Sequence, residues 1–271
     1  MSSVYEALQR ARQANQPRGP IRSEADAGHA VNGAIPLRPR QPQARPQPQP
    51  ERPRPEAPSP VSLAPSPKAS ALGPLLAALR PLLDGDQGVV LQFVAATAGE
   101  GASTIAREFA FLAATAGRRR TLLIDGDRAQ LTIGRALGCS TGQGLVDCLW
   151  HGADEADVLR PVSGPLLSVA CLIGERGPAA ADAATIHEIY DGVRGHFDVT
   201  VVDCPPVTGG AFAQLLPNAA DGVVLVVEAE RTRPAVVLHA KGLVEQAGGT
   251  IIGAVLNKRN NYIPERLYRL L

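Results

Sequence analysis

VVLQFVAATAGEGASTIAREFAFLAATAG, from Val89 to Gly117, is the stretch of sequence that decides the fold. Its first seven residues, Val89–Ala95, are apolar and rich in strand-forming types, so they predict a buried β-strand. A glycine-rich turn follows, and apolar residues at helical spacing then predict a helix that ends near Gly117. In such a unit the backbone N–H groups of the turn and of the helix N-terminus can cradle phosphate oxygens.

Apolar strands and helices alternate through the rest of the chain. The pattern predicts strands at 121–125, 166–172, 199–203, 222–228 and 250–256, and helices at 72–83, 131–137, 145–150, 157–159, 180–194, 211–216 and 234–246. This alternation is typical of an α/β fold, a mainly parallel sheet with helices on both faces. Ligands bind such sheets at the carboxyl ends of the strands, so functional residues are expected just after Ala95, Ile124, Val202 and Leu256.

Acidic side chains stand at two of these strand ends. Asp125 and Asp127 belong to the run LLIDGDR, and Asp203 begins the run DCPP. Because the carboxyl ends of parallel strands meet at one edge of the sheet, we expect the three carboxylates beside the glycine turn, as in a site for Mg²⁺ and a polyphosphate. One carboxylate alone would be read as a cap on a strand end or a helix, but three beside a glycine turn favour a site.

Two further polar residues belong to the same predicted edge. Ser103, in the first turn of the helix after the glycines, can offer its hydroxyl group to Mg²⁺. Asn257 directly follows the last strand, and its amide can donate to and accept from the edge of a base such as adenine. A turn-forming role is the alternative for Asn257.

The first 70 residues differ from the rest in composition. They hold 14 of the 24 prolines, and ten basic against five acidic residues, whereas 71–271 hold 17 basic and 21 acidic residues. Residues 16–70 have little to bury and are expected to form a disordered, Pro-rich linker. Residues 1–15 begin with a capping box at Ser3 and Glu6 and predict a short amphipathic helix, either a docking peptide or a terminus that folds back on the domain 71–271.

Other classes of function find no support. The four cysteines show no C-x-x-C spacing, so buried thiols are expected rather than a zinc site or a disulfide framework. The chain shows no signal-peptide pattern and no run of about 20 apolar residues, which predicts a cytoplasmic protein with no membrane span of its own. No basic patch is interleaved with aromatic residues, so nucleic-acid binding is not expected.

The motifs, in this order and spacing, resemble the bacterial tyrosine kinases (BY-kinases, CpsD/CapB-like), a branch of the ParA/MinD-type P-loop proteins. GEGAST at Gly99–Thr104, LLIDGDR at Leu122–Arg128 and FDVTVVDCPPV at Phe197–Val207 carry the resemblance. GAVLNKRNNYIP at Gly253–Pro264 and the opening SSVYEALQRA are also similar to that family. The resemblance implies a P-loop NTPase fold, ATP or ADP with Mg²⁺, and work in capsule and exopolysaccharide biosynthesis and export. It also implies a membrane polysaccharide co-polymerase or export protein as partner, through which the chain would reach the inner membrane.

The resemblance also implies roles for individual residues. Nucleotide contacts are expected from Gly99, Glu100, Gly101, Ala102, Ser103, Thr104 and Asn257. Metal contacts are expected from Ser103, Asp125 and Asp203, and catalytic roles, if the protein is active, from Asp125 and Asp127.

The chain departs from the family at the phosphate loop. Ala102 stands where the family has a lysine, and the chain's three lysines, Lys68, Lys241 and Lys258, include no evident substitute. Arg107, Arg128 or an arginine of a neighbouring subunit is the alternative source of the charge. Two unit charges about 4 Å apart at an effective dielectric constant of about 20 interact by roughly 4 kcal/mol. Loss of that much transition-state stabilisation slows a reaction by about 10³.

Two more departures concern assembly and phosphorylation. Of the E-x-x-R-x-x-R helix with which active family members form rings, only Arg80 remains. The tyrosine cluster at the family's C-terminus is reduced to Tyr262 and Tyr268. The sequence therefore favours a nucleotide-binding regulator with impaired or absent catalysis, as a monomer or a homo-oligomer. The alternatives are an active ATP-dependent protein-tyrosine autokinase and a scaffold that binds no nucleotide.

Overall fold

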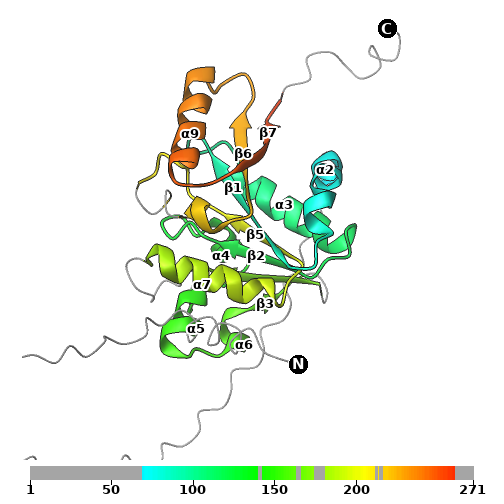
Figure 1. Cartoon of the computed structure of the whole chain (residues 1–271), viewed down its shortest axis with the longest axis vertical. Coiled ribbons are helices and arrows are strands. Elements are labelled where there is room, and N and C mark those ends of the chain that lie inside the picture. Colours follow the sequence, from blue (N-terminus) through cyan, green and yellow to red (C-terminus); the bar gives the residue numbers. More distant parts are fainter. Residues whose placement is uncertain are drawn as a thin grey trace, which may run out of the picture. The chain divides into compact units, whose positions relative to one another are not determined.

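The computed structural model describes residues 69–139, 142–162, 166–173, 181–210, 213 and 216–259 (Figure 1). The predicted N-terminal helix, the Pro-rich linker up to residue 68 and both C-terminal tyrosines lie outside these residues. Within the described ranges, the helices are all too short or too polar to span a bilayer. The four cysteines, all within the described residues, are buried thiols, as predicted.

Seven strands form one sheet in the order β3-β4-β2-β5-β1-β6-β7. Neighbouring strands run parallel, except that β3 and β4 are antiparallel. The strands are β1 (Val89–Ala95), β2 (Thr121–Asp125), β3 (Arg160–Pro161), β4 (Leu167–Cys171), β5 (Val199–Asp203), β6 (Gly222–Glu228) and β7 (Ile251–Asn257). Every strand predicted from the sequence is confirmed to within one residue at each end.

The sequence pattern missed β3. This strand has two residues and pairs at the sheet edge through Arg160 with Val169 and Pro161 with Ser168. Two residues are too few to show the alternation of a strand, and a proline, which has no N–H group, is tolerated only at such an edge.

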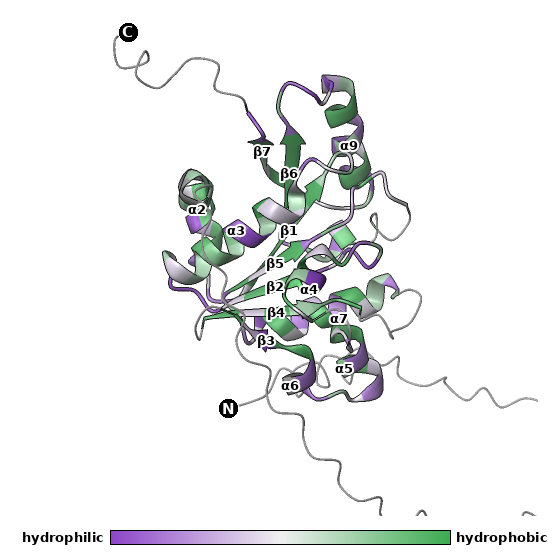
Figure 2. Ribbon diagram, turned by 180° about the vertical axis from the view of Figure 1, so that it is seen from behind, coloured by the Kyte–Doolittle hydropathy of each residue, from purple (hydrophilic) through white to green (hydrophobic). Residues whose placement is uncertain are grey.

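Helices cover both faces of the sheet (Figures 1 and 2). One face is covered by α2 (Gly73–Leu83), α3 (Ala102–Thr115) and α4 (Thr132–Ala136). The other is covered by α5 (Leu145–His151), α6 (Glu155–Val158), α7 (Ala183–Arg194) and α9 (Pro234–Gln246). Short 3₁₀ turns occur at Ala69–Leu72 and Leu216–Ala219. Most of the predicted helix 211–216 lies outside the described residues.

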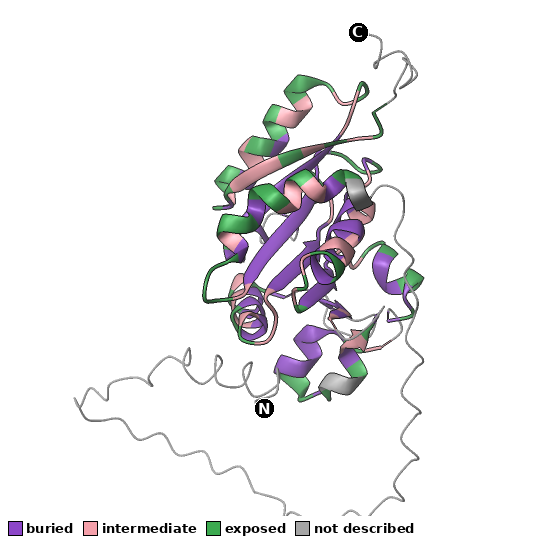
Figure 3. Ribbon diagram, turned by 90° about the vertical axis from the view of Figure 1, so that its right-hand side faces the viewer, coloured by how far each residue is buried: buried purple, intermediate pink, exposed green. Residues whose placement is uncertain are grey.

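Strand β1 contributes to the core on both faces of the sheet. Val90 and Val94 pack in the cluster on the α7 side, and Leu91 and Phe93 pack in the cluster on the α3 side. All seven residues of β1 are buried, as the central strands in Figure 3 show. Phe93 also packs on Phe109 of α3, with ring centroids 5.2 Å apart. This packing helps hold α3 against the strand that precedes it.

Candidate functional site

The glycine turn between β1 and α3 forms a loop at the carboxyl edge of the sheet. Gly99 and Gly101 have φ angles of +88° and +93°, which favour glycine. A Cβ atom on Gly101 would lie 2.3 Å from Asn257 Nδ2, so a larger residue would collide there. Gly101 is the N-cap of α3, whose first turn lines the adjoining cavity. The free N–H groups and the dipole of a helix N-terminus favour an anion at such a place.

The Glu100 side chain stabilises the conformation of the glycine loop through hydrogen bonds. This side chain is buried, and its Oε2 atom accepts a hydrogen bond from the Thr97 N–H group at 2.9 Å. The Thr232 hydroxyl group donates to Glu100 Oε1, and Asn257 Nδ2 donates to the Glu100 carbonyl oxygen at 2.8 Å. The Glu100 carboxylate is therefore committed to the loop itself. The Asn257 side-chain nitrogen already donates to the loop. A contact between Asn257 and a base stays a prediction.

Asp125 and Asp203 meet at the carboxyl edge, as predicted. Strands β2 and β5 pair in register, so that the two residues are direct neighbours. Asp125 Oδ1 accepts a hydrogen bond from the Asp127 N–H group at 3.1 Å, and Oδ2 accepts one from the Gly134 N–H group at 2.8 Å. Burial raises the pKa of Asp125, and these backbone donors offset part of that effect. The Asp125 carboxylate thus fixes the loop after β2 and the first turns of α4.

Asp203 differs from Asp125 because it has no such donors. Its side chain is fully buried, and neither carboxylate oxygen accepts a hydrogen bond from the described part of the chain. Burial raises the pKa of Asp203 to about 8; the nearby Ser103 hydroxyl group, which does not reach hydrogen-bond geometry, opposes this rise, and the charges of Asp125 and Asp127 add to it. A buried carboxylate without a partner is costly unless it is protonated or balanced by a cation. The Asp203 carboxyl group is therefore stable at this position when it is protonated or when a cation lies beside it.

The site opens into a cavity of about 660 Å³. The loop, the first turn of α3, the segment around Asp127 and the DCPP turn line this cavity, with Ala98, Gly99, Gly101, Ala102, Ser103, Thr104, Asp127, Gln130, Cys204, Pro205 and Pro206 among the lining residues. Asp127 is half-buried there, and its Oδ1 atom accepts hydrogen bonds from the N–H groups of Ala129 and Gln130. The volume lies in the range of small-molecule sites, about 300–1,000 Å³.

The donors at this edge fit a magnesium ion that is held jointly with a phosphate group. Hard oxygen ligands are available from Ser103, Asp127 and Asp203. The Asp203 carboxylate has no hydrogen-bond partner in the described structure, and a bound cation would take that place. Among the described residues, His, Cys, Asp and Glu side chains form no group of three that could hold a metal ion by itself. Mg²⁺ is commonly bound by one or two carboxylates, with phosphate oxygens and water completing its coordination. The residues present therefore suit Mg²⁺ as the companion of a bound nucleotide.

The structure also brings to the loop residues that the sequence analysis did not select. Thr232 follows β6 by four residues and reaches Glu100, and Lys258 Nζ donates to the Gly99 carbonyl oxygen at 2.6 Å. Thr232 carries no recognisable sequence signal. For Lys258 the one available signal is its place directly after Asn257, at the end of a strand that was predicted to reach the site.

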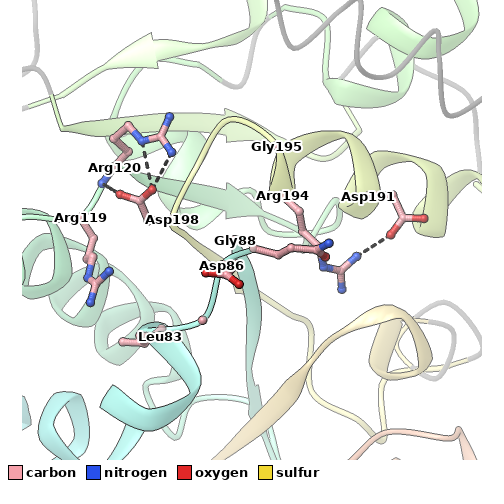
Figure 4. A pocket seen from close by; sticks show the side chains of 11 residues that line it. Leu83, Asp86, Gly88, Arg119, Arg120, Asp191, Arg194, Gly195 and Asp198 are labelled. Carbon is pink, nitrogen blue, oxygen red and sulfur yellow. Dashed lines mark hydrogen bonds and ion pairs between the residues drawn. The ribbon is translucent and has the colours of Figure 1, made fainter.

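A second cavity, of about 460 Å³, lies at the opposite edge of the sheet (Figure 4). Each arginine that lines it has an acidic partner: Arg119 with Asp84, Arg120 with Asp198, and Arg194 with Asp191. Figure 4 shows two of these ion pairs spanning the cavity wall. The guanidinium groups of Arg119, Arg120 and Arg194 are therefore each paired with an aspartate within the chain.

Sequence comparison identifies the family. No family model matches the chain. The tyrosine-protein kinase CpsD of Streptococcus agalactiae serotype III (strain NEM316) is 31% identical over 182 residues, which are 66% of this chain and 78% of that protein. The chain belongs to the CpsD/CapB family of bacterial tyrosine kinases. The succinoglycan biosynthesis transport protein ExoP of Rhizobium meliloti (strain 1021) is also similar, with 30% identity over 188 residues, which are 65% of this chain and 23% of ExoP.

Solved structures agree with the BY-kinase assignment. The chimerical protein CapA2B2 aligns with a TM-score of 0.62 and 25% identity over 72% of this chain and 87% of that one. The septum site-determining protein MinD of Pyrococcus horikoshii OT3, complexed with Mg-ADP, shares the fold, with a TM-score of 0.52 and 21% identity over 68% of this chain and 77% of that one. The fold is that of P-loop NTPases, as the sequence predicted.

Proposed function

We propose that this BY-kinase binds ATP or ADP with Mg²⁺ at the carboxyl edge of its sheet, with phosphoryl transfer impaired or absent, and acts as a regulator in capsule or exopolysaccharide biosynthesis. One observation carries the proposal. The glycine loop, the first turn of α3 and Asp127 line one cavity, and Asp125 and Asp203 are neighbours at the same edge of the sheet. Ala102 lines that cavity at the position where the family has a lysine.

Binding follows from groups that the chain still has. The first turn of α3 directs backbone N–H groups and a positive dipole end toward phosphate oxygens. Ser103 and Asp203 would hold Mg²⁺ against the same phosphates, and Asp125 would keep the loop after β2 in position through its bonds to backbone N–H groups. When bound, Mg²⁺ supplies positive charge that lowers the repulsion between the phosphates and the acids.

Impaired transfer follows from the one group that is missing. A methyl group at Ala102 cannot offset the charge that builds on the transferred phosphoryl group, whereas a lysine there would act at close range. At roughly 4 kcal/mol for such a charge pair, the expected loss is about 10³ in rate. The affinity for the nucleotide in its ground state is expected to fall less, because many backbone N–H donors contribute to it.

The comparisons support a partner at the membrane. ExoP is named as a succinoglycan biosynthesis transport protein, and this chain matches only about a quarter of its length, 23%. From the name of this relative we propose that the chain works in the cytoplasm with a membrane polysaccharide co-polymerase or export protein as its partner. The predicted N-terminal helix, residues 1–15, is the proposed docking segment.

Calorimetric titration of the purified full chain with MgADP and MgATP tests binding, and Ser103→Ala tests the site. We expect binding by the wild type, weaker binding by Ser103→Ala, and ATP turnover near background with and without the co-polymerase. Mass spectrometry is expected to find no phosphate on Tyr262 or Tyr268. Robust turnover that Asp125→Ala abolishes would establish an active autokinase instead, and absence of nucleotide binding would establish a scaffold.

A further inference from the structure

We infer that Lys258, directly after strand β7, supplies to a bound nucleotide the ground-state attraction that a lysine at position 102 would give, without replacing that lysine in phosphoryl transfer. This inference rests on the proposed nucleotide binding and assigns a binding role to a residue outside the glycine motif. The ammonium group would thus approach the phosphates from the β6–β7 side of the loop instead of from the first turn of α3.

The position of the ammonium group is the first observation. Lys258 Nζ donates to the carbonyl oxygen of Gly99 at 2.6 Å, and Gly99 lines the 660 Å³ cavity. Nζ also lies 3.0 Å from Glu228 Oε2, at the end of β6. An ammonium group has three N–H donors. Two of them are used by Gly99 and Glu228, which leaves a third donor. Lys258 is not among the residues that line the cavity, so this donor would meet a phosphate oxygen through a shift of the side chain.

The backbone directs the side chain toward the loop. Lys258 has a φ of +57°, in the left-handed region that a residue with a side chain rarely adopts. The preceding residue, Asn257, donates from Nδ2 to the carbonyl oxygen of Glu100 at 2.8 Å. Two consecutive residues at the end of β7 are therefore bonded to two consecutive carbonyl groups of the loop. Such a conformation persists only where its surroundings hold it, and it occurs preferentially at functional sites.

The charges around the loop show why a cation is needed here. Asp127 lines the cavity, Glu100 belongs to its loop, and the buried Asp125 and Asp203 are neighbours at the same edge of the sheet, so a nucleotide would add negative charge to an acidic region. Arg107 pairs with Glu108 at 3.0 Å, and Arg231 shares Glu228 with Lys258, at 3.5 Å against 3.0 Å for the lysine. Unlike these two arginines, Lys258 also has a recorded hydrogen bond to the loop itself, from Nζ to the Gly99 carbonyl oxygen.

Its exposure leaves Lys258 free to respond to a ligand. The side chain is 41% exposed, whereas that of Glu228 is 15% exposed. A partly hydrated ammonium group on a flexible four-carbon stem can shift toward a phosphate oxygen with little loss of packing. Its partner Glu228 is the more buried of the two and would keep the lysine near the loop.

A double-mutant cycle tests the inference through binding rather than turnover. The MgADP dissociation constant is measured by calorimetry for the wild type, Lys258→Met, Ala102→Lys and the double variant. We expect Lys258→Met to weaken binding at least tenfold in the wild-type background and less than threefold in the Ala102→Lys background, because the restored lysine would supply the charge. Lys258→Arg should retain most of the affinity.

Lys241→Met is the matched control, since Lys241 sits on α9 and pairs with Glu245 at 3.1 Å. It removes the same charge from the chain and should leave the dissociation constant unchanged. If the wild type binds MgADP and Lys258→Met binds it equally well, the inference is overturned and the proposed function stands. If the loss is equally large in the Ala102→Lys background, Lys258 shapes the loop and does not replace the missing charge. If the wild type binds no nucleotide, both proposals fail.

Discussion

At the amino edge of the sheet, Arg119, Arg120 and Arg194 are each paired with an aspartate, whereas at the carboxyl edge Asp203 is buried without a hydrogen-bond partner in the described structure. Both edges carry a cavity and several charges. They differ in whether the chain itself balances those charges. A balanced network stabilises the fold, and an unbalanced buried acid is retained where something else supplies the counter-charge.

The same difference separates the two acids at the carboxyl edge. Asp125 is bonded to two backbone N–H groups and organises its surroundings, while its neighbour Asp203 has none in the described residues. Adjacent residues of identical type therefore have different tasks. Burial alone therefore does not identify a ligand site. The two buried acids are distinguished by their hydrogen-bond partners.

The largest expected effect is the pH dependence that Asp203 imposes on stability. Its folded-state pKa is about 8, above the unfolded value of about 3.9, so the folded chain binds this proton more tightly. The free energy of unfolding of the metal-free protein should therefore fall as pH rises from about 4 to about 8, by on the order of 5 kcal/mol from this group. Denaturant unfolding in EDTA at several pH values measures the slope.

Asp203→Asn should remove most of that slope. Asp125, whose pKa is also raised by burial, leaves a smaller slope of the same sign in the variant. Asp191→Asn, at an exposed position of the amino edge, is the control and should keep the wild-type slope. Equal slopes for the wild type and Asp203→Asn would show that the pKa of Asp203 is not raised in the folded protein.

Ala102→Lys should have the next largest effect. A lysine at the start of α3 is expected to raise ATP turnover by up to about 10³, from roughly 4 kcal/mol of charge stabilisation. Steady-state phosphate release measures it. Ala129→Lys adds the same charge elsewhere on the cavity wall and should leave turnover near background. An equal rise in both variants would mean that general charge, and not the position at residue 102, limits the reaction.

Glu100→Ala should release the loop. The variant removes the acceptor for the Thr97 N–H group and the link to Thr232, and a hydrogen bond to a charged group contributes about 1.5–3 kcal/mol. Hydrogen exchange is expected to speed up at the Thr97 amide and to stay unchanged in β2. Glu100→Gln keeps one acceptor oxygen and should lose less protection. Unchanged exchange at Thr97 would show that the loop holds its shape without this side chain.

Arg120→Met at the amino edge should have the smallest effect. The ion pair with Asp198 is largely exposed, and such pairs contribute about 0.2–1 kcal/mol to stability. The dissociation constant for MgADP should not change. A tenfold loss of affinity in this variant would move the nucleotide site to the amino edge and reverse the comparison between the two cavities.

Much of the fold could be predicted because its signals are local. Val89–Ala95 is apolar throughout since both faces of β1 are covered, and the glycines of the turn are required where φ is positive. The acids were predicted to converge because parallel strands end at one edge, and the register of Asp125 with Asp203 confirms this. The two-residue strand β3 and the bonds from Thr232 to Glu100 have no local pattern, and so they were missed.

The amino-acid sequence by itself determined the strand–loop–helix unit, the acids at the strand ends and the absence of a lysine at Ala102. Only the tertiary structure decided that Asp203 lacks a partner while Asp125 has two, and that Lys258 meets Gly99 across 159 positions of sequence. The physical reason is the distance along the sequence over which each kind of interaction acts. Backbone preferences and hydrophobic periodicity act over a few residues, whereas the surroundings of a charged side chain depend on the order of strands in the sheet, which brings β1, β6 and β7 side by side.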